Sequence, residues 1–130
     1  MENEVRQLNP LTLAYIGDAI YEVHVREHLI QSGQTNPHEL HGRAVKFVAA
    51  PAQAAIIHKW LADKQLTEAE EAIFRRGRNA KSGSIPKNAS VQAYRYATGF
   101  EALVGFLYLT KNEKRLNELI VDAIRYVEKG

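Results

Sequence analysis

The chain contains no cysteine, and only one methionine and one tryptophan, among its 130 residues. The absence of cysteine excludes disulfide bonds, thiolate zinc sites and cysteine nucleophiles, and it fits a reducing compartment. No apolar run approaches the roughly 18 uninterrupted residues that a membrane-spanning helix needs. The first residues, MENEVRQL, lack the basic and then apolar pattern of a secretory signal. We therefore expect a soluble, cytoplasmic protein with no membrane partner.

The composition is that of an ordinary globular chain, with 45% hydrophobic and 25% charged residues. A chain of this length can bury a hydrophobic core but is too short for a catalytic domain and a separate binding domain. We expect a single domain over residues 1–130.

Helix signals punctuate the first half of the chain. Asn36, followed by proline and then by Glu39, has the cap, the first-turn proline and the acid of a helix start. Pro51 should break whatever begins there. The spacing predicts one helix over about 37–49 and another over about 51–62.

The second half is helical in pattern as well. Thr67 and Glu70 have the spacing of a capping box, and the segment 111–129 places its apolar residues on one helical face. Nowhere do residues of alternating polarity stand between turn signals, as a β-hairpin would require. The predicted fold class is all-α. The stripe of the last helix consists of Leu116, Leu119, Ile120, Ala123, Ile124 and Val127.

Two segments, 11–30 and 90–109, are apolar on nearly all sides at helical spacing, which is typical of buried helices. Each carries an acid in mid-span, Asp18 in the first and Glu101 in the second. Small residues in both segments would let the backbones approach closely, and this would bring Asp18 and Glu101 together. The small residues are Ala14, Gly17 and Ala19 in one segment and Ala97, Gly99, Ala102 and Gly105 in the other.

Two carboxylates close together in a protein interior need protonation, a cation or a route to water. Carboxylate oxygens suit hard divalent ions such as Mg²⁺ or Mn²⁺, which activate water and polarise phosphates. A structural alternative stays open at this point: Asp18 caps a turn or pairs with an arginine, and Glu101 points outward.

No acidic residue stands between Glu71 and Glu101, although this interval holds six of the 17 lysines and arginines of the chain. Within it, RRGRNAKSGSIPKN, residues 75–88, has the glycine, serine and proline content of a loop. An exposed basic loop favours a polyanion partner, whereas a solvated loop that happens to be basic is the alternative. The six basic residues are Arg75, Arg76, Arg78, Lys81, Lys87 and Arg95.

Two stretches resemble a known family. YIGDAIYE, residues 15–22, resembles the signature helix of the ribonuclease III catalytic domain, and ATGFEALVGFLYL, residues 97–109, resembles the second acidic helix of that fold. The whole chain is similar to the Mini-ribonuclease III branch, whose members consist of the endonuclease domain alone. The resemblance implies a ribonuclease III-like helical bundle.

Carried over by position, Asp18 matches the signature-helix aspartate that is essential for catalysis, and Glu101 matches the metal-binding glutamate. Ribonuclease III proper has further acids where this chain has Leu11, Ala14 and Thr98, and the Mini branch is similarly depleted. The resemblance implies that Asp18 and Glu101 hold Mg²⁺, for which Mn²⁺ can substitute, and it leaves the number of metal ions open.

The resemblance also implies an activity. Family members are metal-dependent endoribonucleases that hydrolyse double-stranded RNA, leave a 5′-phosphate and a 3′-hydroxyl, and act as homodimers with the signature helices near the two-fold axis. The resemblance points to precursor 23S ribosomal RNA as the substrate and to the six basic residues as the RNA-binding surface. Glu22, one turn beyond Asp18, is predicted to be an outer-shell ligand or the ion-pair partner of Arg26.

Two other functions are compatible with the sequence. Loss of the accessory acids would suit a non-catalytic, ribosome-associated protein that binds structured RNA with the same fold, although retention of Asp18 and Glu101 favours an enzyme. A protein-interaction module would have no affinity for RNA and would tolerate replacement of the basic segment.

Overall fold

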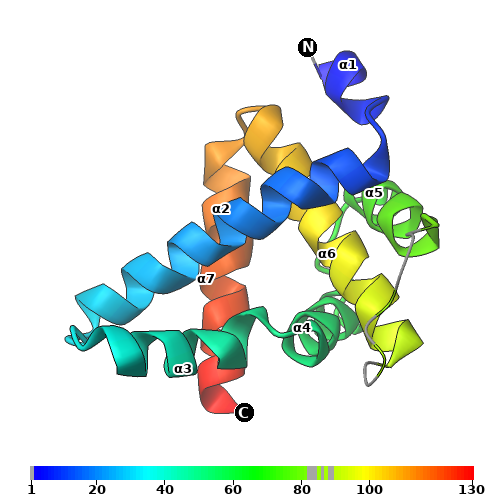
Figure 1. Ribbon diagram of the computed structural model, residues 1–130. Helices are drawn as coiled ribbons and strands as arrows, with labels where there is room; N and C mark the ends of the chain where they lie inside the picture. Colours follow the sequence, from blue (N-terminus) through cyan, green and yellow to red (C-terminus); the bar gives the residue numbers. More distant parts are fainter. Residues whose placement is uncertain (1, 82–84, 86, 88–89) are drawn as a thin grey trace.

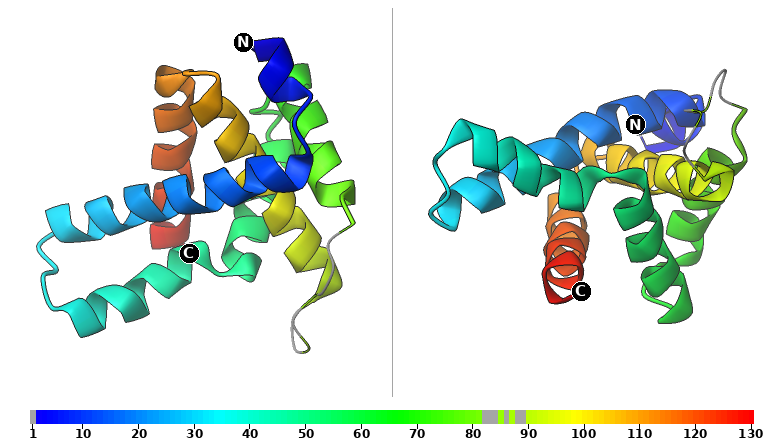
Figure 2. Two further views of the ribbon diagram at one scale, coloured as in Figure 1. Left: turned by 45° about the horizontal axis from the view of Figure 1, so that its top comes forward. Right: turned by 60° about the horizontal axis from the view of Figure 1, so that its bottom comes forward.

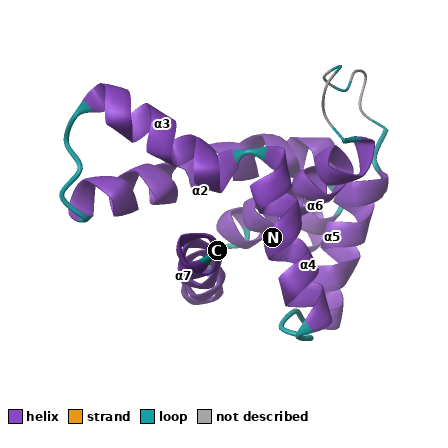
Figure 3. Cartoon of the chain, turned by 90° about the horizontal axis from the view of Figure 1, so that it is seen from below, coloured by secondary structure: helices purple, strands orange, loops and turns teal. Residues whose placement is uncertain are grey.

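Helices account for all regular secondary structure in the residues that the computed structural model describes, which are 2–81, 85, 87 and 90–130 (Figure 3). This confirms the predicted all-α class. None of the helices in these residues has both the length and the apolar character needed to cross a bilayer. The helices are α1 (Glu2–Arg6), α2 (Pro10–Gln31), α3 (Pro37–Val48), α4 (Ala50–Ala62), α5 (Glu68–Asn79), α6 (Val91–Leu109) and α7 (Glu113–Lys129).

Capping side chains set two of the helix starts. The side chain of Asn36 accepts hydrogen bonds from the backbone N–H groups of His38 and Glu39, and so begins α3. Thr67 and Glu70 form a reciprocal capping box at the start of α5. Both starts agree with the sequence prediction. Helix caps can be predicted from the sequence because they join residues that are close together in the chain.

One extended residue separates α3 from α4. Ala49 has a ψ of 148°, and Pro51, which lacks a backbone N–H, stands in the first turn of α4. The predicted boundary between helices over 37–49 and 51–62 is confirmed to within about one residue. Within the described residues the break leaves the Val48 carbonyl without a backbone donor, since the Ala52 N–H bonds to the Ala49 carbonyl instead.

The central helix of the fold is α6, which packs against α2 on one side and against α4 and α5 on the other (Figures 1 and 2). Its Phe100 ring is fully buried, stacks on Trp60 of α4 at a centroid distance of 5.5 Å and meets the edge of Tyr21 of α2 at 4.9 Å. Aromatic pairs of this kind add about 0.5–1.5 kcal/mol beyond the burial of their area. These rings join three helices at the centre of the core.

Contrary to the prediction, α2 is not buried on all sides. One face packs within the chain, while the opposite side leaves Tyr15, Val23 and Ile30 at 83%, 55% and 54% of their full exposure. We call these three residues the open face of α2. The helix therefore has two apolar faces. One packs within the chain, and the other is exposed to solvent in a single chain.

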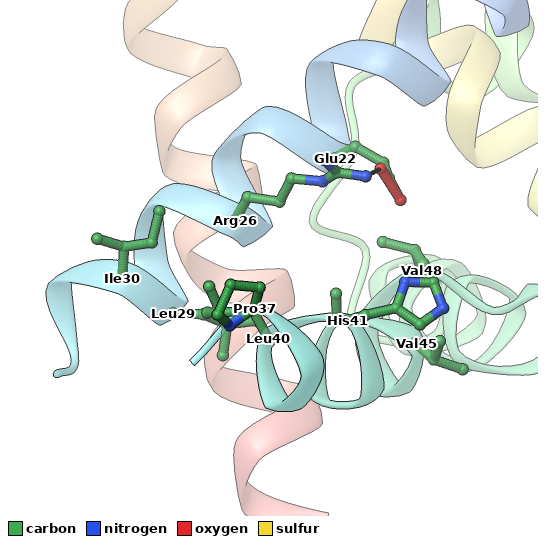
Figure 4. A pocket seen from close by; sticks show the side chains of 10 residues that line it. Glu22, Arg26, Leu29, Ile30, Pro37, Leu40, His41, Val45 and Val48 are labelled. Carbon is green, nitrogen blue, oxygen red and sulfur yellow. Dashed lines mark hydrogen bonds and ion pairs between the residues drawn. The ribbon is translucent and has the colours of Figure 1, made fainter. Parts of the chain in front are cut away.

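The C-terminal half of α2 and the returning α3 form an arm that extends from the rest of the molecule (Figures 1 and 3). Between the two helices lies a pocket of about 380 Å³, lined mostly by apolar side chains, with the Glu22–Arg26 ion pair at its edge (Figure 4). Ile30 of the open face lines this pocket, so apolar surface continues from α2 to α3. The α3 residues of the pocket are Pro37, Leu40, His41, Ala44, Val45 and Val48.

The last helix, α7, docks by a single stripe, as predicted, and polar links fix its position. Asp122 accepts a hydrogen bond from the Trp60 indole N–H at 2.7 Å. Arg115 donates two hydrogen bonds, of 2.8 and 2.9 Å, to the buried carboxylate of Glu70, which is thereby neutralised. The stripe residues Leu116, Leu119, Ile120, Ala123 and Ile124 are buried, and Val127 is partly buried.

Candidate active site

The two acid-bearing helices, α2 and α6, cross at a pair of glycines. A side chain on Gly17 would overlap the backbone carbonyl of Glu101, and one on Gly105 would overlap that of Leu13. Glycine at both positions lets the backbones touch, although glycine in a helix interior costs about 0.5–1 kcal/mol relative to alanine. The predicted close approach is confirmed, and Asp18 follows directly after the crossing point.

The crossing brings the carboxyl groups of Asp18 and Glu101 within hydrogen-bonding reach of each other. Burial raises the pKa of Glu101, and the neighbouring Asp18 raises it further, to about 8. The polar side chain of Gln53 partly opposes this rise in the pKa of Glu101. Glu101 therefore holds a proton at neutral pH. Ionising both acids would place two negative charges side by side, which is a state that a bound cation stabilises.

The two acids differ in exposure. Glu101 is half-buried, but Asp18 is exposed, which corrects the prediction that both acids are buried in the protein interior. Asp18 is exposed although its neighbours on the helix, Gly17 and Tyr21, are buried. The acid pair can be reached from solvent, as a site for a large substrate must be.

The chemistry of the donor set fits a hard divalent cation. Among the described residues, no three or more acidic, histidine or cysteine side chains lie where they could share a metal ion. At the helix crossing, Asp18 and Glu101 are the two side chains that could hold one. Mg²⁺ suits such a site because it keeps several of its waters. Glu22 was predicted to be either an outer-shell ligand or the ion-pair partner of Arg26. It forms the ion pair, at 2.7 Å.

The predicted basic loop RRGRNAKSGSIPKN is helical at its start, which corrects the sequence prediction. Arg75, Arg76 and Arg78 belong to the last turns of α5. Gly77 suggested a loop, but it is a packing residue, because a side chain there would collide with Gly99 of α6. Glycine marks close contact between two helices at this point.

Two of the six predicted RNA-binding residues, Arg75 and Arg76, form hydrogen bonds or ion pairs with residues that precede the basic segment. Arg76 donates hydrogen bonds to the backbone carbonyls of Arg6 and Leu8, the second at 2.9 Å, and so ties the segment after α1 to α5. Arg75 forms a surface ion pair with Glu71 at 3.5 Å, an interaction that contributes only about 0–1 kcal/mol. Arg76 is therefore engaged within the fold, whereas Arg75 is held weakly.

The other four basic residues lie at or near the surface. Arg78 and Arg95 line a shallow pocket of about 450 Å³ between the end of α5 and the start of α6. The Arg78 guanidinium lies over the ring of Tyr96, 5.9 Å from its centroid. Lys81 and Lys87 are exposed. The remainder of the predicted loop, residues 82–84, 86 and 88, lies outside the described residues.

Gln53 is a site residue that the sequence analysis did not single out. It is 1% exposed on α4, its amide donates a hydrogen bond to the Val48 carbonyl at 3.1 Å, and its presence lowers the pKa of Glu101. A signal for it does exist, since Gln53 is the only polar residue between Lys46 and His58. A polar residue inside an apolar run is the same pattern that singles out Asp18.

The chain is similar to known proteins over most of its length. The Ribonuclease III domain family matches residues 11–112, which include both acids. The chain is 52% identical to a Mini-ribonuclease 3 of Enterococcus faecalis, over 95% of this chain and 94% of that protein. It is 46% identical to one of Streptococcus pneumoniae, over 96% and 98% respectively. A crystal structure of a Fusobacterium nucleatum protein superposes with a TM-score of 0.82 at 33% identity, over 94% of this chain and 96% of that one.

Proposed function

Because the chain belongs to the Mini-ribonuclease 3 branch of the ribonuclease III family, we propose that it is an endoribonuclease that cleaves double-stranded RNA. We assign Asp18 and Glu101 as its metal-holding catalytic pair. The observation that carries this assignment is their contact at the crossing of α2 and α6, where the pKa of Glu101 is raised to about 8. A scaffold would gain stability by replacing either acid with an uncharged residue, so retention of both favours a ligand that needs two oxygens.

The ligand that we assign to the pair is Mg²⁺, with Mn²⁺ as a substitute. Such an ion supplies Lewis-acid activation of water and offsets negative charge on the phosphate under attack. The protein holds the two carboxylate groups on helices α2 and α6. The contact of these helices at Gly17 and Gly105 leaves them little freedom to move relative to each other. Glu101 must release its proton to bind the ion, so metal affinity should rise with pH towards about 8.

We propose that the pocket between α5 and α6 grips the RNA backbone. Arg78 and Arg95 line this pocket, and Lys81 and Lys87 are exposed on the connection between the two helices. Because α6 carries both Arg95 and Glu101, about 9 Å apart along the helix axis, phosphate contacts and the acid pair share one rigid element. Binding of this kind depends strongly on salt and reads the A-form backbone more than the bases.

We propose that a second copy of the chain covers the open face of α2 and the adjoining pocket between α2 and α3. Ile30 of the open face lines that pocket (Figure 4), and the open face lies on the same helix as Asp18. A two-fold contact there would pair two acid sites, one for each strand of a duplex.

The product ends, the natural substrate and the location are further parts of the proposal, and the family resemblance alone supports them. We infer that cleavage leaves a 5′-phosphate and a 3′-hydroxyl, that the substrate is precursor 23S ribosomal RNA, and that the protein acts in the cytoplasm.

A non-catalytic RNA-binding protein is the second candidate. The observation in its favour is that the described residues offer two acids at the site rather than a larger cluster, with Leu11, Ala14 and Thr98 where the wider family has acids. Such a protein would bind duplex RNA through Arg78 and Arg95 and leave it intact.

Cleavage of a long RNA duplex in Mg²⁺ separates the two candidates, with binding followed in parallel. Asp18→Asn and Glu101→Gln should each lower the cleavage rate by roughly 100-fold or more, as expected for loss of groups that act on transition-state charge, and should keep RNA affinity. Glu27→Gln, which removes an exposed acid from the same helix α2, is the matched control and should cut normally. Wild-type protein that binds but does not cut duplex or precursor ribosomal RNA would support the second candidate.

A further inference from the structure

Aromatic rings hold the side chain of Arg78, whereas a carboxylate holds the structural arginine of α7. Arg115 of that helix forms its ion pair with Glu70 at 2.8 Å. The guanidinium carbon of Arg78 instead lies 5.6 Å from the centroid of the Phe74 ring and 5.9 Å from that of the Tyr96 ring. Both distances are within the roughly 6 Å reach of a cation–π interaction. The two rings therefore contact the guanidinium of Arg78 through their faces.

The packing of three helices fixes these two rings. Phe74 stands one turn before Arg78 on α5, so the two side chains share a helix face. A side chain on Gly99 of α6 would collide with the Phe74 ring, which therefore lies directly on that helix. Tyr96 stands one turn before Gly99, and its ring stacks on that of His58 of α4 at a centroid distance of 4.3 Å, with 18° between the ring planes. Helices α4, α5 and α6 together thus place the rings that Arg78 contacts.

Contact through the rings leaves hydrogen-bond donors of Arg78 available. A guanidinium carries all its N–H donors in its own plane, so a ring against its face uses none of them, whereas a carboxylate partner occupies the donors and offsets the charge. The Nε–H of Arg78 bonds to the side chain of Asn79 at 3.1 Å. Among the described residues, Arg78 forms no ion pair, and the chain has no acid between Glu71 and Glu101. The terminal N–H groups can therefore form the two parallel hydrogen bonds that a phosphate accepts.

We propose that Tyr96 is a positioning residue that orients the guanidinium of Arg78 for bidentate contact with a phosphate of the RNA backbone. Tyr96 lines the same pocket as Arg78 and Arg95. A long side chain loses rotamer freedom when it binds a ligand, and restraint before binding removes part of that cost. This inference rests on the proposed function, because it takes the pocket between α5 and α6 as the RNA-binding site.

Binding of a short, perfect RNA duplex, followed by fluorescence anisotropy in chelator to prevent cleavage, measures this role. Tyr96→Leu keeps an apolar side chain and removes the ring. It should weaken binding by about 3- to 10-fold, the range expected for one long side chain that must be ordered on binding. Tyr96→Phe keeps the ring and should stay within about twofold of the wild-type affinity. In a protein that already carries Arg78→Gln, Tyr96→Leu should have no further effect, because the ring acts through Arg78.

Tyr108→Leu is the matched control. Tyr108 lies near the other end of α6, and its ring faces the ammonium group of Lys111 at 5.4 Å, so the same change removes a cation–π contact outside the pocket. It should leave RNA affinity unchanged. A folded Tyr96→Leu protein with wild-type affinity would overturn the inference, and so would an equal loss of affinity with and without Arg78→Gln. If Tyr96→Leu does not fold, Tyr96→Met takes its place, and failure of both to fold would assign Tyr96 a purely structural role and likewise overturn it.

The proposed RNA-binding pocket has its own control in the same experiment. RNA binding that is absent in the wild type, or is unchanged in Arg78→Gln, would overturn that pocket and this inference with it. Binding that is weakened in Arg78→Gln but unchanged in Tyr96→Leu would overturn the inference alone.

Discussion

The guanidinium of Arg76 donates a hydrogen bond to the backbone carbonyl of Leu8 at 2.9 Å and another to that of Arg6. This contact holds the N-terminal segment against α5. Replacing Arg76 with alanine should lower the free energy of unfolding by about 1–2 kcal/mol, since hydrogen bonds to charged groups contribute about 1.5–3 kcal/mol and these are partly exposed. Urea denaturation measures this loss. The affinity of the Arg76→Ala protein for duplex RNA at low temperature should stay within about twofold of the wild-type value. A large drop in affinity would show that Arg76 contacts the RNA.

Salt dependence tests the pocket between α5 and α6. A basic residue that neutralises one phosphate contributes about one unit to the slope of log affinity against log salt concentration. Arg78→Gln and Arg95→Gln should each reduce that slope by about one, and should weaken binding to unrelated duplexes alike. Arg125→Gln, on the exposed side of α7, is the control and should change neither quantity. Unchanged slopes in both pocket variants would place the RNA elsewhere on the molecule.

The glycine at the helix crossing can be compared with a glycine in open space. Gly17→Ala should destabilise the protein by about 2–4 kcal/mol, because its new methyl group overlaps the Glu101 carbonyl and forces α2 and α6 apart. Gly42→Ala, in the interior of α3 with nothing within 4 Å, should stabilise it by about 0.5–1 kcal/mol. Thermal denaturation of both variants tells the two effects apart. Equal effects would mean that the helices do not meet at Gly17.

The raised pKa of Glu101 predicts how the stability of the metal-free protein depends on pH. The folded chain keeps the proton up to about pH 8, whereas the unfolded chain releases it near 4.5. Between these values unfolding releases a proton, so stability falls as pH rises. Glu101→Gln should flatten this fall and stabilise the protein at pH 8 by about 1–3 kcal/mol, given about 1.4 kcal/mol per pKa unit.

Denaturant titrations in chelator across pH 5–8 measure this difference. Asp18→Asn should act in the same direction, because it removes the carboxylate that helps to raise the pKa of Glu101. A Glu101→Gln protein that is less stable than wild type at pH 8 would show that Glu101 is a structural acid.

The open face of α2 predicts a dimer that depends on its apolar side chains. Ile30→Asp should convert the protein to a monomer, because a charge would be buried without a partner in the contact. Val121→Asp places the same charge on a residue of α7 that is 46% exposed, against 54% for Ile30, and should leave the dimer intact. Sedimentation velocity distinguishes the two species. A wild-type protein that is monomeric at high concentration would contradict the assignment of this surface.

Local signals predicted most of the fold correctly. The starts at Asn36 and Thr67 and the break before Pro51 depend on neighbouring residues, so the sequence states them without reference to the rest of the chain. The meeting of Asp18 and Glu101 could also be predicted, because small residues in two apolar helices indicate a close crossing even though the acids are far apart in sequence.

The wrong predictions have a common physical origin in contacts between distant segments. Apolar periodicity does not distinguish a face that packs within the chain from one left open, so α2 was expected to be buried on all sides. Gly77 resembles a loop residue unless its contact with α6 is known. The contacts of Arg76 with the carbonyls of Arg6 and Leu8 could not be predicted from the sequence either, and its role in RNA binding stays a prediction.

The crossing of α2 and α6 also has a consequence for the synthesis of the protein. Asp18 and Glu101 are more than 80 residues apart in the sequence, and the second acid lies about four fifths of the way along the chain. Contacts over such separations form late, because the intervening chain must be ordered first. On the proposed assignment, a nascent chain that has not reached α6 carries one acid and no nuclease centre. An incomplete chain that is released early from a ribosome therefore cannot cleave ribosomal RNA.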